Sequence, residues 1–189
     1  MKKAVLSLML CLAWAAGMAQ PDKVYTRLSE IKDAAQVYQL EIRYKRLKRI
    51  PPIVFRCTNL RVLDLSKNFI DTLPPEIGEL VNLEVLNLQR NRIRHVPPQI
   101  GQLARLRVLN LSRNPILELP DAMGGLAELE ELILWMTGVI SLPPTFVALN
   151  YSLKTLDMRA CPLSYDDQEA IETLLPSPRK RWDYVCNCK

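Results

Sequence analysis

Residues 60–128 read LRVLDLSKNFIDTLPPEIGELVN, LEVLNLQRNRIRHVPPQIGQLAR and LRVLNLSRNPILELPDAMGGLAE, three segments of 23 residues in strict register. Each segment has an aliphatic residue at its first, fourth, sixth, eleventh and fourteenth positions. Repetition at such a period indicates a repeat architecture, in which each segment is one coil. The alternation around the fourth and sixth positions is the period of two of a short strand with one buried face.

The ninth position of each segment is an asparagine: Asn68, Asn91 and Asn114. A tight buried turn after the strand leaves backbone N–H and C=O groups that need partners, and an asparagine side chain carries both a donor and an acceptor. We therefore predict a structural ladder of asparagines that joins neighbouring coils, with no catalytic role.

The pattern LxxLxLxxNxIxxLPxxIGxLxxL resembles the leucine-rich repeat family in its short 23-residue form. The Pro-Pro and Ile-Gly elements resemble the Ras-suppressor and Scribble-like class and bacterial exported relatives. The resemblance implies an α/β, right-handed solenoid with parallel strands on a concave face and short turns on the convex side. We expect about six coils over residues 37–163. The first and fifth coils depart from the pattern, with Lys45 and Thr137 at the ninth position.

Segments on both sides of the coils are expected to cover the open ends of the solenoid, as terminal caps of repeat proteins do. In the N-terminal cap, residues 20–36, apolar residues at helical spacing predict a short helix over 26–36. In the C-terminal cap and tail, residues 164–189, Ser164 and Asp167 form a helix-start signature and Pro176 ends the helix. The resemblance to bacterial relatives implies a short return strand after this helix.

Residues 1–19 have the features of a secretory signal peptide: two lysines, an apolar run over 4–16, and small residues at 17 and 19. The alternatives are a membrane anchor, for which the run is shorter than the ~20 residues that a spanning helix needs, and a lipid anchor on Cys11. We expect a chain that starts near Gln20, has no transmembrane segment, and is exported to the periplasm, the medium or the cell surface.

Charge is unevenly distributed along the 189 residues, whose formal net charge is +5. Residues 21–94 contain 14 basic and 9 acidic residues, whereas residues 95–178 contain 5 and 10. A nucleic-acid-binding protein would need a continuous basic stripe with stacking aromatics. An exported chain with a negative second half predicts no nucleic-acid partner.

Four cysteines follow the signal segment, an even number that suits an oxidising compartment. Cys57 stands at a buried leucine position of its coil, and it lies ~20 Å from Cys161 at ~4.8 Å per strand, too far for a disulfide. Cys161 occupies the ninth position of the sixth coil. We predict a disulfide from Cys161 to either Cys186 or Cys188.

Few residues could support catalysis or metal binding. His95 is the only histidine, is expected to be solvated, and lies some four coils from the tail cysteines. Nucleophilic hydrolysis would need a base beside a serine or cysteine, and the Cys-Asn-Cys pair lacks the helix-start context of a redox dithiol. We predict a non-enzymatic protein without cofactor or metal.

The third, fifth, seventh and eighth positions of each coil are expected to point outward from the concave strands. Basic residues run along the first four coils, and apolar bulk follows on the fifth. The candidate partner-binding residues are Arg43, Tyr44, Lys67, Gln89, Arg90, Arg113, Ile133, Trp135, Met136 and Arg159. The basic residues could instead be a solvated surface, and Trp182 and Tyr184 of the tail could cover the apolar group.

The sequence therefore predicts a non-enzymatic exported protein that binds a protein partner through its concave face, where exposed aromatic and arginine residues favour a binding hot spot. The alternative is a surface binder of anionic glycan or another envelope polymer through Lys67, Arg90, Arg92 and Arg113. A structural spacer without a specific ligand is a third possibility.

Overall fold

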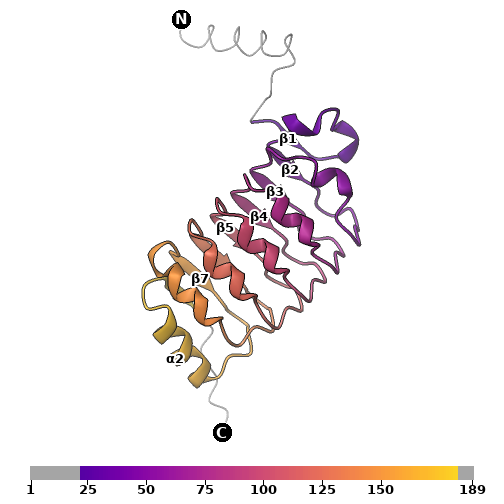
Figure 1. The fold of residues 1–189 in the computed structure, drawn as a ribbon. Helices are drawn as coiled ribbons and strands as arrows, with labels where there is room; N and C mark the ends of the chain where they lie inside the picture. The colour runs from indigo at the N-terminus through magenta and orange to yellow at the C-terminus, as the bar shows by residue number, and fades with distance from the viewer. Residues whose placement is uncertain (1–21, 183–189) are drawn as a thin grey trace, which may run out of the picture.

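The computed structural model describes residues 22–182, which form one parallel sheet of eight short strands in chain order (Figure 1). From β3 to β6 each residue pairs with the residue 23 positions on, as Val62 does with Val85 and Val85 with Val108. The offset is 24 between β6 and β7, where the fifth coil has one extra residue. The strands are β1 (Val24–Tyr25), β2 (Gln39–Glu41), β3 (Val62–Asp64), β4 (Val85–Asn87), β5 (Val108–Asn110), β6 (Glu131–Ile133), β7 (Thr155–Asp157) and β8 (Arg179–Arg181).

Short 3-10 helices form the opposite wall of the solenoid, and most begin at a proline, which fits the first turn of a helix because its missing N–H would be unpaired there. Buried leucine, isoleucine and valine side chains from both walls fill the space between them as one continuous core. The predicted solenoid is therefore confirmed. The 3-10 helices are η3 (Pro52–Val54), η4 (Pro75–Glu79), η5 (Pro98–Gln102), η6 (Asp121–Gly125) and η7 (Pro144–Tyr151).

Neighbouring 3-10 helices approach closely at the nineteenth position of the coils. A Cβ atom added to Gly101 would lie 2.3 Å from the carbonyl oxygen of Ala122, and one added to Gly124 would lie 2.6 Å from that of Thr145. The Ile-Gly element therefore allows two backbones to come into contact on the convex side.

The asparagines form hydrogen bonds both within their own coil and with its neighbours. The Asn91 amide donates to the carbonyl of Leu65 (3.0 Å) on the preceding coil and to that of Leu88 (2.9 Å) on its own, and its oxygen accepts from Ile70 N–H (3.0 Å). Asn68 and Asn114 repeat this arrangement. All three side chains are buried, so these bonds satisfy backbone groups that water cannot reach.

The prediction of a single helix over residues 26–36 is wrong. β1 is followed by two single 3-10 turns, η1 (Leu28–Glu30) and η2 (Ala34–Gln36). Asp33 between them is extended, and its carboxylate accepts from the N–H of Ala35 (3.0 Å) and the side chain of Gln36 (3.2 Å). Such a local bond competes with helix formation, so the chain stops and restarts at Asp33. Leu28 and Ile31 still pack against the core.

At the other end, α2 (Tyr165–Leu174) begins at the predicted residue and lies on the last coil (Figure 1). Ser164 and Asp167 form a full capping box, and the hydrogen bonds from Ser164 hold the pKa of the Asp167 carboxyl below its usual value. Ile171 and Leu175 are buried. β8 then returns parallel to β7, as the resemblance implied.

Candidate interaction surfaces

A second set of polar side chains stands at the fifth position of the coils, on the concave face. The side-chain oxygen of Asp64 accepts the N–H of Ser66 (2.8 Å), and Asn87 and Asn110 accept those of Gln89 (3.1 Å) and Ser112 (3.0 Å) in the same way. These bonds fix the chain as it leaves each strand. Their signal in the sequence is the recurrence of Asp or Asn at the fifth position of four coils, from which these bonds were not predicted.

The residue at the eighth position, one after the residue whose N–H the fifth-position side chain accepts, has a left-handed backbone in every coil. The φ values are 55° at Tyr44, 59° at Lys67, 56° at Arg90, 55° at Arg113 and 54° at Met136. The predicted eighth-position residues therefore project from turns at the edge of the sheet, not from the strands themselves. This conformation is uncommon for residues other than glycine, and the fifth-position bonds help to hold it.

The fifth coil interrupts the polar concave face. Ile133 stands where the other coils have Glu, Asp or Asn, and Trp135 stands where they have Arg, Ser or Gln. The Arg113 guanidinium from the preceding coil lies 4.4 Å from the centre of the Trp135 ring, a cation–π distance. Trp135 and Ile133 are both half-buried. Ser66 and Ser112, in the same column as Trp135, are buried, so they offer little to a partner.

The tail does not reach this apolar group through Trp182, whose ring nitrogen donates to Glu172 of α2 (3.3 Å) and whose side chain packs against the core. Tyr184 lies outside the described residues. The face of the Trp135 ring is thus contacted by Arg113 and not by Trp182.

Arg43 and Arg159, the expected edges of the binding face, are both ion-paired within the chain. Arg43 contacts Glu41 (2.9 Å) and Asp64 (3.0 Å), and Arg159 contacts Asp157 (2.7 Å). Burial raises the pKa of Asp157, but hydrogen bonds and charge from Arg159 outweigh it and leave the pKa lowered. These two arginines are exposed but already neutralised.

The second-position column, where the chain enters each strand, is also neutralised. Arg61 lies 3.8 Å from Glu84, and Glu130 accepts from both Arg107 and Lys154, the latter at 2.6 Å. The hydrogen bond from Lys154 is the largest cause of the lowered pKa of Glu130. Charges of opposite sign thus alternate across this side of the sheet.

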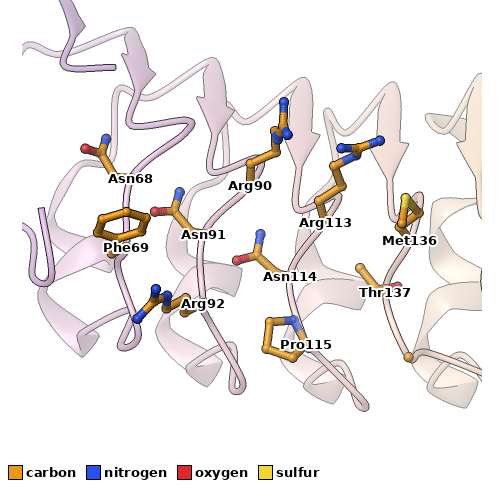
Figure 2. Close-up of a pocket in the computed structure, with 11 residues that line it drawn as sticks. Asn68, Phe69, Arg90, Asn91, Arg92, Arg113, Asn114, Pro115, Met136 and Thr137 are labelled. Atoms are coloured by element: carbon orange, nitrogen blue, oxygen red, sulfur yellow. The ribbon is translucent and has the colours of Figure 1, made fainter. Parts of the chain in front are cut away.

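A groove of about 540 Å³ runs along the other edge, across the turns that follow β3 to β6 (Figure 2). We call it the edge groove. It combines three guanidinium groups with apolar side chains, and no carboxylate from residues 22–182 lines it. Arg92 lies over the Phe69 ring at 4.6 Å, and Lys67, just outside the groove, lies over Tyr44 at 4.7 Å. The lining residues are Asn68, Phe69, Arg90, Asn91, Arg92, Arg113, Asn114, Pro115, Met136, Thr137 and Gly138.

The predicted residues thus fall into two groups. Gln89, Ile133 and Trp135 stand on the concave face, whereas Arg90, Arg113 and Met136 line the edge groove, and Arg113 joins the two by stacking on Trp135. Phe69, Arg92 and Pro115 complete the groove. The tenth position, which supplies all three, follows the asparagine directly in the repeat, so its column could have been read from the sequence.

Among the cysteines, Cys57 is fully buried, and burial is the main cause of its raised pKa. Cys161 takes the place of the asparagine in the sixth coil: its sulfur lies 3.2 Å from the Leu134 carbonyl and 3.4 Å from the Thr137 hydroxyl. Cys186 and Cys188 lie outside the described residues, so the predicted disulfide stays a prediction. Within residues 22–182 no group of three His, Cys, Asp or Glu side chains is placed to hold a metal ion.

Residues 36–137 match the family described as the leucine-rich repeat region. The chain belongs to the leucine-rich repeat family. No curated protein matches this leucine-rich repeat chain. Between residues 22 and 182 it has no helix with the length and apolar character needed to cross a membrane.

Solved structures of leucine-rich repeat proteins share its fold. A leucine-rich repeat protein of Leptospira interrogans is 33% identical over 77% of this chain and 36% of its own, with a TM-score of 0.72. An internalin from Listeria monocytogenes, 18% identical with a TM-score of 0.69, is matched over 85% of this chain and 47% of its own, and shows the fold alone.

The leucine-rich repeat ectodomain of the plant membrane receptor kinase GASSHO1/SCHENGEN3 from Arabidopsis thaliana was solved in complex with CASPARIAN STRIP INTEGRITY FACTOR 2. It is 32% identical over 69% of this chain and 16% of its own, with a TM-score of 0.58. This chain therefore spans less than half the length of each of these three proteins.

Proposed function

We propose that this leucine-rich repeat protein is exported and, without catalysis, binds a protein partner on its concave face. The observation that carries the proposal is the break in the polar concave face at the fifth coil, where Trp135 and Ile133 are half-buried beside the Arg113 guanidinium. Aromatic and arginine side chains dominate the energetics of protein interfaces. The family is widely used for protein binding, and the plant ectodomain was solved with a partner in place.

Replacing Trp135 with alanine should weaken partner binding by at least ~2 kcal/mol, as truncation of a hot-spot residue does. The partner is first captured by a photo-crosslinking amino acid at Gln89 on the concave face and identified by mass spectrometry. Its affinity for the wild-type and Trp135→Ala chains is then measured by calorimetry.

The matched control is Glu76→Ala, which alters an exposed residue of η4 on the convex side. Far-ultraviolet circular dichroism checks that both variants are folded. Loss of binding on the Glu76 change, with full affinity retained by Trp135→Ala, would place the partner on the convex face and refute the proposal.

A second candidate function is binding of an anionic envelope polymer, which is favoured by the arginines of the edge groove that have no ion pair among residues 22–182. Exposed charges are screened by salt and apolar burial is not. Binding that is abolished by moderate salt and unchanged by Trp135→Ala would favour the polymer.

A further inference from the structure

We propose that the edge groove binds an extended acidic segment of a protein that carries a large apolar residue at one end. The inference rests on the proposed protein-binding function and adds the chemistry of the partner. It concerns a surface beside the concave face, on the turns that follow the strands (Figure 2).

The charge of the groove is not compensated within the described chain. Residues 22–182 contain seven ion-pair contacts, and none of them involves an arginine of the groove. Their basic residues lie at strand entries, as Arg107 does, within β8, or two residues after a strand, as Arg43 and Arg159 do. Arg90 and Arg92 are exposed and join none of these contacts. The Nε atom of Arg113 is buried and has no hydrogen-bond partner in this part of the chain. A row of guanidinium donors without acceptors suits carboxylates, which accept two parallel hydrogen bonds from arginine.

The far end of the groove is apolar. Met136, which is 45% exposed, and Pro115 both line it, and Leu117 and Ile140 on the same two coils are 67% and 45% exposed. Leu117 rests on the next coil, since a Cβ atom added to Gly138 would lie 2.5 Å from its Cδ2. Two neighbouring coils thus present four apolar side chains on their turns, and clustered exposed apolar residues mark a contact site more often than single ones do.

The dimensions of the groove set the length of the segment. It crosses four coils, or three spacings of ~4.8 Å, about 14 Å in all, which an extended chain covers with four to five residues. Carboxylates would lie over the third and fourth coils, and a leucine or phenylalanine over the fourth and fifth. An anionic polymer would satisfy the arginines but leave the apolar end without a partner, so the groove favours a protein segment.

The test uses fluorescein-labelled peptides and the full chain, with binding measured by fluorescence anisotropy. The probes are Gly-Asp-Glu-Asp-Leu-Phe-Gly and its reversed order, because either chain direction could place the two ends correctly. The amide peptide Gly-Asn-Gln-Asn-Leu-Phe-Gly lacks the charge, and Gly-Asp-Glu-Asp-Ser-Ser-Gly lacks the apolar end. One acidic–apolar order should bind about tenfold more tightly than either reduced peptide, since both ends of the groove contribute.

Variants locate the binding. The double change Arg90→Gln/Arg92→Gln should reduce the affinity of the acidic–apolar peptide to that of the amide peptide, whereas Arg56→Gln/Arg105→Gln removes the same charge from exposed residues outside the groove and should leave it unchanged. Met136→Gln should reduce it to that of the Ser-Ser peptide. Val81→Gln, at an exposed apolar residue on the convex side, is its control.

Equal binding of all peptides, or insensitivity to the Arg90/Arg92 change, would overturn the inference. A second outcome would also overturn it: dextran sulfate binds in an Arg90/Arg92-dependent manner, and the Ser-Ser peptide binds as tightly as the acidic–apolar peptide. The groove would then recognise charge alone. Trp135 does not line the groove, so the two proposals fail separately. If no peptide binds but partner capture still depends on Trp135, the groove inference is wrong and concave-face binding stands. If the acidic–apolar peptide binds but partner capture does not depend on Trp135, the groove inference stands and concave-face binding is wrong.

Discussion

At the scale of single residues, the asparagine ladder explains why one polar side chain is placed in an otherwise aliphatic core. Asn91 is only 8% exposed, and its amide reaches backbone groups on two coils. Without this side chain the N–H of Ile70 would be a buried donor without an acceptor, which costs ~1–3 kcal/mol, whereas the Leu65 carbonyl also accepts from the Asn68 amide. Where Thr137 replaces the asparagine, its hydroxyl keeps only the bond to the Leu134 carbonyl of its own coil (2.8 Å) and meets the Cys161 sulfur.

Replacing Asn91 with alanine should lower the free energy of unfolding by ~1–3 kcal/mol, because the buried N–H of Ile70 loses its acceptor and the carbonyls of Leu65 and Leu88 each lose one of two amide donors. Urea unfolding followed by circular dichroism measures the change. Asn82→Ala is the control: Asn82 also bonds to the preceding coil, through Thr58 (3.0 Å), but at an exposed position where water can replace it. Equal losses in the two variants would show that burial does not set the strength of the ladder.

At the scale of elements, the convex wall depends on the close approach of successive 3-10 helices, and the strand side depends on left-handed turns at the eighth position. The first requires glycine. The second is occupied by lysine, arginine, tyrosine and methionine, whose long side chains then project along the edge of the sheet. The close approach at glycine packs neighbouring coils together, and the left-handed turn exposes long side chains on the surface.

Gly101→Ala should destabilise the protein by ~1–3 kcal/mol, the usual cost of forcing an extra carbon into a packed site, because the new Cβ would meet the backbone of Ala122. Gly125→Ala is a matched control in a neighbouring turn, where the nearest heavy atom to an added Cβ is 3.9 Å away. Thermal unfolding of both variants tests this. An equally stable Gly101→Ala chain would mean that the two coils can separate without cost.

The capping box of α2 predicts a pH-dependent contribution to stability. The pKa of Asp167 is lowered in the folded chain by the Ser164 hydrogen bonds, so its contribution is complete above the unfolded pKa of ~3.9 and is lost as the pH falls through the lower folded value. The difference in unfolding free energy between wild type and Asp167→Asn should be constant from about pH 7 to 5 and shrink below about pH 4.

Urea titrations at several pH values measure this difference. Asp166→Asn is the control, since it removes a charge from the same helical turn and leaves the capping box intact. If the difference in unfolding free energy between wild type and Asp167→Asn stayed the same down to the lowest pH, the stability of α2 would not depend on the charge of its cap.

At the scale of the whole molecule, the distribution of charge follows the solenoid. Both sides of the sheet carry arginines, but those at the strand entries are paired with carboxylates, and those of the edge groove are not. A net charge gives no indication of this difference. The arrangement gives the molecule one cationic edge beside a mixed-charge concave face, which suits a binding protein that steers an acidic partner.

The proposed export leads to a prediction for the whole chain. Its mature form should begin at or near Gln20, because small residues at 17 and 19 follow an apolar run of signal-peptide length. Intact-mass spectrometry of protein recovered from the periplasm or medium tests this. A chain that retains Met1 to Ala19, or that carries a lipid on Cys11, would contradict cleavage at this site.

The repeat pattern was sufficient to predict the coil, the buried face of each strand and the places of the asparagines, and the Ser164–Asp167 signature was sufficient to predict the start of α2. These features depend on periodicity and on short-range capping, which are properties of residues a few positions apart. The N-terminal segment shows the limit of such reasoning: its apolar residues have helical spacing and do pack on the core, but the extended backbone at Asp33 divides it into two 3-10 turns.

Which outward arginines are paired within the chain could not be predicted from the repeat and depends on how the coils stack. Arg43 and Arg159 are neutralised by carboxylates, Arg113 is stacked on Trp135, and Arg90 is unpaired among the described residues, although all four are arginines at the seventh or eighth position of a coil. An outward side chain finds its partner either two residues away on its own coil, as Arg159 does in Asp157, or on the adjacent coil, as Arg43 does in Asp64, because residues about 23 positions apart lie side by side. The left-handed turn directs the residue at the eighth position of each coil from the concave face to the edge.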